Sequence, residues 1–152
     1  MQSKLTWKSG MSFETENRGL KSLIDVPSDL GGNDTGPTPK EMVLNAMCAC
    51  SAMDVVSIAK KMRIEIGDFS MEAKAEKSAT IPSYFTSTHL KYFLTGENLN
   101  VEKIIQAVHL SMTKYCGVSY MVSKTTDITY DITVNGDKVH EDKANFTLEV
   151  VI

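Results

Sequence analysis

The sequence predicts an α+β fold in which antiparallel strands surround one long apolar helix. Three observations carry this prediction: short strand-like segments at the N-terminus, a strong helix signal from Pro39 to Arg63, and alternating apolar and polar residues after that helix. The chain has 152 residues, of which 42% are hydrophobic. This length suits one domain, residues 1–152, with a core of its own.

The first 26 residues predict three antiparallel strands, because both connections between the segments contain turn residues, Ser9-Gly10 and Asn17-Arg18-Gly19. The expected strands are Lys4–Trp7, Met11–Glu16 and Lys21–Asp25. Residues 27–39 contain three prolines and three glycines, which exclude a continuous helix or strand. We therefore expect a loop there.

The long helix has a clear start signal. Thr38 occupies the N-cap position, Pro39 the first helical position and Glu41 the third, which together predict a capping box. The middle of the segment is apolar on nearly every side, so such a helix needs other structure around it. Residues 42–59 lack Lys and Arg but include Asp54, and a carboxylate disfavours a membrane span. We interpret the segment as a buried helix of a soluble protein.

The second half of the chain predicts two more strands, a helix and a terminal hairpin. Asn100 is a candidate N-cap for a helix over Val101–Tyr115, which Cys116-Gly117 interrupts. The expected elements are strands at Ile64–Ala75 and Thr88–Leu94, a short helix at Val118–Lys124, and a hairpin of Asp127–Val134 with Asn145–Val151.

Charge and N-terminal composition limit the class of protein. The formal net charge is -3, so no positive field favours nucleic acid or an anionic membrane surface. The first ten residues, MQSKLTWKSG, contain no apolar run typical of a secretory signal. We expect a cytoplasmic protein that binds neither nucleic acid nor membrane.

Three cysteines, Cys48, Cys50 and Cys116, are the candidates for chemistry. Two residues along a helix correspond to about 200° of rotation, so the Cys48 and Cys50 thiols point to opposite sides. We expect no metal site, because the three histidines are scattered along the sequence. A thiol at the start of the helix after Cys116 would have a lowered pKa. The alternative is that all three cysteines are packing residues.

Two segments resemble the motifs of the OsmC/Ohr family, the osmotically inducible and organic hydroperoxide resistance proteins. The first is GGNDTGPTPKEMVLNAMCACSAMDVV at residues 31–56. The second is LSMTKYCGVSYM at residues 110–121, in the variant found in the YhfA-like branch. The resemblance implies curved antiparallel sheets wrapped around a long central helix, and an intertwined homodimer with active sites at the interface.

The resemblance also implies a two-cysteine thiol peroxidase. The first family cysteine lies eleven positions after the proline that opens the helix, which selects Cys50 as the peroxidatic nucleophile and leaves Cys116 as the resolving thiol. The implied substrate is a hydroperoxide, and the implied reductant is an external dithiol, with a lipoyl group as one candidate and no bound cofactor. Arg18 is the candidate cation beside the Cys50 thiolate, and a solvated hairpin tip is its alternative interpretation.

One family feature is displaced. Lys40 stands where the hydroperoxide resistance branch has a glutamate, and Glu41 is interpreted as a helix cap. The alternative function on the same scaffold is therefore a non-catalytic dimer that binds a small ligand or senses redox state.

Overall fold

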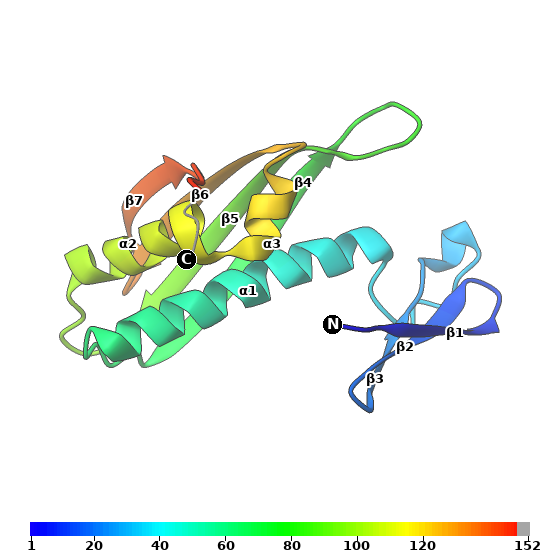
Figure 1. Cartoon of the computed structure of the whole chain (residues 1–152), viewed down its shortest axis with the longest axis horizontal. Helices are drawn as coiled ribbons and strands as arrows, with labels where there is room; N and C mark the ends of the chain where they lie inside the picture. Colours follow the sequence, from blue (N-terminus) through cyan, green and yellow to red (C-terminus); the bar gives the residue numbers. More distant parts are fainter. Residues whose placement is uncertain (149–152) are drawn as a thin grey trace. The chain divides into compact units, whose positions relative to one another are not determined.

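The computed structural model describes residues 1–148, which form two compact units, Met1–Val43 and the described residues from Leu44 onward (Figure 1). In the first unit, β1 (Lys4–Ser9), β2 (Ser12–Asn17) and β3 (Leu20–Ile24) pair antiparallel in the order β1-β2-β3. Arg18 and Gly19 form the tight turn between β2 and β3, with φ values of 54° and 80°. The predicted three-stranded start is confirmed.

One buried carboxylate organises the loop after β3. The side chain of Asp25 accepts hydrogen bonds from the backbone N–H groups of Val26, Asn33 and Thr35 and from the Thr35 hydroxyl. These bonds, the Thr35 hydroxyl foremost, lower the pKa of Asp25. A Cβ on Gly32 would lie 1.8 Å from the Val26 carbonyl oxygen, so only glycine fits there. The loop, which includes the short 3-10 helix η1 (Ser28–Leu30), thus has a defined conformation.

Helix α1 (Pro39–Lys61) begins and ends with local hydrogen-bonded caps. The backbone N–H of Thr38 donates to the Glu41 carboxylate and that of Glu41 donates to the Thr38 hydroxyl, so the predicted capping box is confirmed. At the other end, Arg63 has a φ of 57°, and Ile64 N–H donates to the Ala59 carbonyl. This left-handed turn ends the helix at Lys61, two residues before the predicted end.

One stripe of α1 is buried, formed by Met47, Ser51, Val55, Ile58 and Ala59. Met53 and Val56 are 73% and 51% exposed. Among residues 1–148, α1 is the one helix with the length and apolar composition to cross a membrane, and 28% of its most apolar window is buried. The expected absence of membrane binding stays a prediction.

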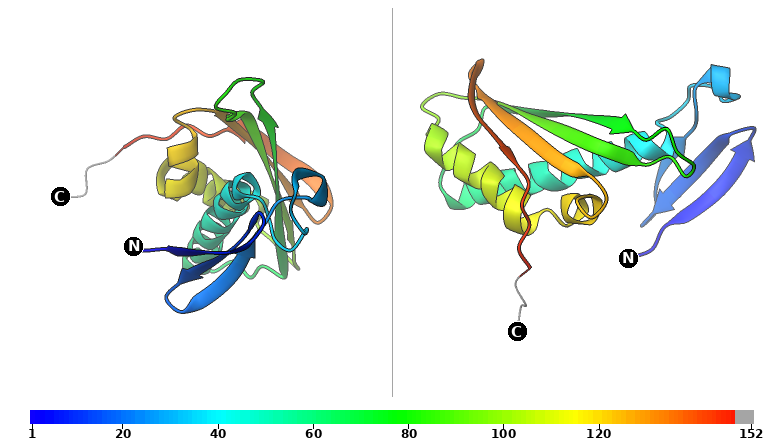
Figure 2. Two further views of the ribbon diagram at one scale, coloured as in Figure 1. Left: turned by 90° about the vertical axis from the view of Figure 1, so that its right-hand side faces the viewer. Right: turned by 90° about the horizontal axis from the view of Figure 1, so that it is seen from above.

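The second unit contains a four-stranded sheet with helices on one face (Figure 2). Its strands, in spatial order, are β4 (Asp68–Lys77), β5 (Phe85–Thr95), β6 (Asp127–Val134) and β7 (Asp137–Lys143). The sheet is not purely antiparallel as expected, because β5 and β6 pair in parallel. The helical segment between them carries the chain back to the start of the sheet, as a parallel connection requires.

The strands before and after that segment differ from prediction in their bounds. β4 begins at Asp68 rather than Ile64, because Arg63 and Ile64 belong to the left-handed turn that ends α1. The hydrogen bond from the Gly67 N–H to the Thr95 carbonyl joins the chain to β5 just before β4 starts. β5 is longer than predicted at both ends. The predicted alternation along β5 is confirmed, because Leu90, Tyr92 and Leu94 are buried against the helices.

The crossover consists of α2 (Val101–Leu110), the π-helical turn η2 (Ser111–Tyr115) and α3 (Gly117–Val122). The Asn100 side chain accepts a hydrogen bond from the Lys103 N–H, which confirms the predicted cap. The buried stripe on α2 and η2 packs against residues of α1, β5 and β6 in one core. Its fully buried members are Ile104, Ala107, Val108 and Met112.

The terminal hairpin was predicted wrongly in its second strand. Asn135-Gly136 forms a two-residue turn with φ values of 52° and 94°, so β7 follows at once as Asp137–Lys143. Charged residues dominate this edge strand, so it lacks an apolar signal. Residues 145–148 are not strand, and residues 149–151 of the predicted strand lie outside the described residues.

Candidate redox site

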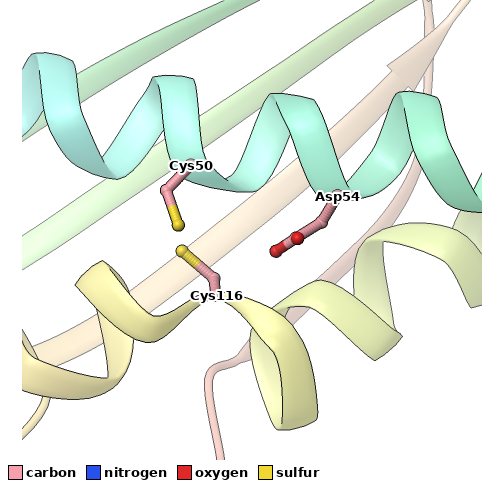
Figure 3. Close-up of side chains that lie close together, drawn as sticks. All are labelled: Cys50, Asp54 and Cys116. Atoms are coloured by element: carbon pink, nitrogen blue, oxygen red, sulfur yellow. The ribbon is translucent and has the colours of Figure 1, made fainter. Parts of the chain in front are cut away.

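Two of the three predicted site residues meet in the second unit. Cys50 comes from the middle of α1, and Cys116 from the junction of η2 and α3. Their sulfur atoms point toward each other, with the Asp54 carboxylate beside them (Figure 3). The two Sγ atoms and a carboxylate oxygen of Asp54 all lie within 4.8 Å of one another. Residues 66 positions apart in the sequence thus form one polar cluster.

A π-helical turn sets the direction of the Cys116 side chain. The Cys116 N–H donates to the Ser111 carbonyl at 3.0 Å, which adds one residue to the last turn before the break. Carbonyls of that turn, those of Met112 and Thr113, accept hydrogen bonds from the N–H groups of Asn145 and Thr147. The segment after β7 therefore holds the turn that carries Cys116.

The environment of Cys116 favours the protonated thiol. The side chain is fully buried, and burial raises the pKa of Cys116 to about 12, against two hydrogen bonds with Ser119 that lower it. The Cys116 thiol donates to Ser119 Oγ at 3.1 Å, and Ser119 N–H donates to the sulfur at 3.4 Å. The prediction of a lowered pKa from the following helix is wrong, because desolvation outweighs the donors at the start of the helix.

A chain of buried hydroxyls leads to Asp54. Tyr92 Oη lies 2.6 Å from Ser51 Oγ, Ser51 Oγ lies 2.9 Å from Ser111 Oγ, and Ser111 Oγ donates to Asp54 Oδ2 at 3.0 Å. Because each hydroxyl has one proton, the bond from Ser111 to a carboxylate fixes the order of donation as Tyr92, Ser51, Ser111, Asp54. Burial raises the pKa of Asp54, and the hydrogen bond from Ser111 opposes that shift.

Sequence reasoning missed this chain. Ser51 and Asp54 are polar residues in an apolar helix, which is the signal that was available. Ser111 and Tyr92 gave no such signal, because they lie on other elements and meet Ser51 only in the folded chain.

Arg18, Cys48 and Glu41 each have a distinct local environment. Arg18 is exposed at the tip of the β2–β3 turn in the first unit, and its role beside the thiolate stays a prediction. Cys48 is half-buried against the core, and burial raises the pKa of its thiol. Glu41 caps α1, as interpreted from the sequence.

The cluster offers three donor atoms of the kinds that bind metals. A closed structural zinc site requires four protein ligands, and the donor group within the described residues comprises Cys50, Asp54 and Cys116 alone. We therefore interpret the cluster as a thiol pair with a carboxylate. The sequence-based expectation of no metal stays a prediction.

Fold and site together define a class: an α+β protein whose long helix places one cysteine against a second cysteine at a helix break. Comparison with known proteins agrees with this description. The model of the family described as "OsmC-like protein" matches residues 31–131. Protein YhfA of Escherichia coli strain K12 is 37% identical over 135 residues, which cover 88% of this chain and 98% of YhfA. The chain belongs to the OsmC-like family.

Solved structures show the same fold. A hypothetical protein from Aquifex aeolicus VF5 has a TM-score of 0.78 at 27% identity, with 88% of this chain and 95% of that chain covered. A Legionella pneumophila protein described as organic hydroperoxide resistance protein OsmC has a TM-score of 0.64 at 23% identity, with 88% and 96% covered. These likenesses show that the chain shares the fold of these proteins.

Proposed function

We propose that the protein is a thiol peroxidase that reduces hydroperoxides through Cys50 and Cys116. The observation that carries this proposal is the placement of the two sulfurs within 4.8 Å of each other. A packing role needs no such pairing of two thiols from different elements. Pairing also favours redox chemistry over the alternative of a dimer that only binds a small ligand.

The reaction has three steps. The Cys50 thiolate attacks the terminal oxygen of the hydroperoxide, the O–O bond breaks, and the alkoxide leaves as an alcohol after taking a proton. The resulting Cys50 sulfenic acid is then attacked by the Cys116 sulfur, which gives a Cys50–Cys116 disulfide and water. An external dithiol, with a lipoyl group as one candidate, reduces this disulfide by exchange, so the protein needs no bound cofactor.

Two further features belong to this proposal. Arg18 is the proposed cation that favours the Cys50 thiolate, because an adjacent positive charge lowers a thiol pKa. The protein is proposed to act in the cytoplasm as a homodimer.

Peroxide consumption with a dithiol reductant tests the function. Cys50→Ser removes the nucleophile, so we expect the rate to fall to that of the uncatalysed reaction. Cys48→Ser is the matched control on the same helix and should retain the wild-type rate within about threefold, since Cys48 is absent from the cluster. A wild-type rate in Cys50→Ser, or a wild-type protein that consumes no peroxide, contradicts the proposed function.

A further inference from the structure

Asp54 lies beside both sulfurs but takes no part in the steps above. One of its carboxylate oxygens is within 4.8 Å of Cys50 Sγ and of Cys116 Sγ, and its side chain points into the same space (Figure 3). A single water or a small side-chain rotation bridges such a separation, and acid–base contacts commonly tighten only when the reacting groups are in place.

The second step of the reaction has a proton to move. The attacking Cys116 sulfur carries a proton and is fully buried, so bulk water does not receive it directly. The thiol donates to Ser119 Oγ, but a neutral hydroxyl is too weak a base to keep a proton near neutral pH. At the same time, the oxygen of the Cys50 sulfenic acid must gain a proton to leave as water.

The hydroxyl chain holds the Asp54 side chain in place. Ser111 donates to Asp54 Oδ2, and Ser51 and Tyr92 stand behind it as further donors. This arrangement holds the carboxylate in one orientation, and because a carboxylate has about four acceptor sites, the bond from Ser111 leaves it able to take a proton. Burial, which raises the pKa of Asp54, makes it a stronger base than an exposed carboxylate.

We propose that Asp54 is the proton carrier of disulfide formation, an inference that rests on the proposed peroxidase function. Asp54 accepts the proton of Cys116 as that sulfur attacks Cys50, and delivers it to the departing oxygen. An electron pair of the Cys116 sulfur forms the S–S bond, and the S–O bond breaks with its pair on oxygen. Cys116 is oxidised, Cys50 is reduced, water leaves, and Asp54 ends as the carboxylate with which it began.

Ser111 is a positioning residue in this scheme, because it touches the carboxylate and neither sulfur is among its hydrogen-bond partners in residues 1–148. Removal of the Ser111 hydroxyl should let the Asp54 side chain move but leave its carboxylate, the proposed base, in the protein. Substitution of Ser111 should therefore slow disulfide formation less than substitution of Asp54.

The test is a single turnover of the reduced full-length protein with one equivalent of cumene hydroperoxide. Peroxide loss reports the first step; dimedone capture of the Cys50 sulfenic acid and mass spectrometry of the disulfide report the second. In Asp54→Asn we expect disulfide formation to be about 100-fold slower or more, with captured sulfenic acid increased and peroxide loss no slower than in wild type. Asp54→Glu, which keeps a carboxylate, should stay within about tenfold of wild type, and Ser111→Ala should lie between wild type and Asp54→Asn.

Asp137→Asn is the matched control, an exposed aspartate on β7, and should behave as wild type. Disulfide formation at the wild-type rate in Asp54→Asn, or equal slowing of both steps, overturns the inference and leaves the proposed function intact. If Asp54→Asn does not fold, the same two outcomes are read from Ser111→Ala: slower disulfide formation with unchanged peroxide loss supports the inference, and a wild-type rate of disulfide formation overturns it. A wild-type protein that consumes no peroxide instead overturns the proposed function, and the inference with it.

Discussion

The chemistry of Cys116 is decided by a competition between burial and two hydrogen bonds. Ser119 offers its N–H and its hydroxyl to the sulfur, yet desolvation dominates and the pKa of Cys116 rises to about 12. A helix start lowers a thiol pKa when the sulfur has access to water. At Cys116 the same motif sits in the hydrophobic core, so the proton stays until a nearby base removes it.

This balance predicts slow alkylation of Cys116 in the folded, reduced protein. At pH 8, a thiol with a pKa of about 12 has roughly three orders of magnitude less thiolate than one with the ordinary pKa of about 8.5. Because the pKa is raised, the rate should increase about tenfold per pH unit from pH 8 to pH 11. Peptide mapping after iodoacetamide treatment measures the alkylation rate of Cys116, with urea-unfolded protein as the control. Equal rates in folded and unfolded protein would contradict the assignment.

At the scale of elements, helix ends and loops are fixed by specific local contacts. Arg63 takes a left-handed conformation, which usually favours glycine, to let Ile64 bond back to Ala59. In the first unit, the loop after β3 is ordered because Asp25 collects N–H donors that would otherwise lack partners. Each element thus ends where its free backbone groups find hydrogen-bond partners.

Asp25→Asn tests the role of this carboxylate. An amide replaces one acceptor oxygen with a donor that faces N–H groups, so we expect the folded-to-unfolded ratio at pH 7 to fall about tenfold. The pKa of Asp25 is lowered in the folded state, so its stabilisation is present above the unfolded pKa of about 3.9 and is lost as pH falls through the folded pKa.

The difference in folding stability between Asp25→Asn and wild type should therefore shrink below about pH 4. Urea unfolding at pH 7 and at lower pH measures it. Asp29 is an exposed aspartate in the same loop. Asp29→Asn is therefore the control, and its stability should match that of wild type at pH 7 and at lower pH. A constant difference across this range would argue against an ionised Asp25 as the cause.

At the scale of the whole molecule, α1 presents more apolar surface than one sheet covers. Its buried stripe faces the core, whereas Met53 and Val56 remain largely exposed. Met53 and Val56 are three residues apart, so they lie on adjacent turns of one helix face, and a partner bound there would cover both side chains. A second copy of the chain is the occupant that the proposed homodimer supplies.

Light scattering on the purified protein measures its mass in solution and so tests the proposed homodimer. One chain has a mass of 16.8 kDa, so a dimer has about twice that mass. Met53→Lys places a charge on the exposed face of α1 and should shift the mass toward one chain. Ile81→Lys, at a fully exposed site in the β4–β5 connection, should leave the mass unchanged. A wild-type mass of one chain would contradict the dimer.

Local signals in the sequence predicted much of the fold. The capping box at Thr38 and Glu41 and the Asn100 cap are contacts between residues close in the chain, so the sequence predicted them correctly. The alternation in β5 was also predicted correctly, because a strand places successive side chains on opposite faces. The charged β7 strand carried no apolar pattern, and its position followed instead from the Asn135-Gly136 turn. The parallel pairing of β5 with β6 depends on how the crossover packs, which no local pattern specifies.

The sequence by itself determined the long apolar helix, its caps, the family motifs and the two cysteines worth testing. Only the tertiary structure decided that these thiols share one cluster, that Asp54 lies beside them, and that Cys116 holds its proton tightly. The physical reason is that a pKa and a hydrogen-bond chain depend on neighbours brought together by packing and on the water that packing excludes, and neither is encoded within one segment.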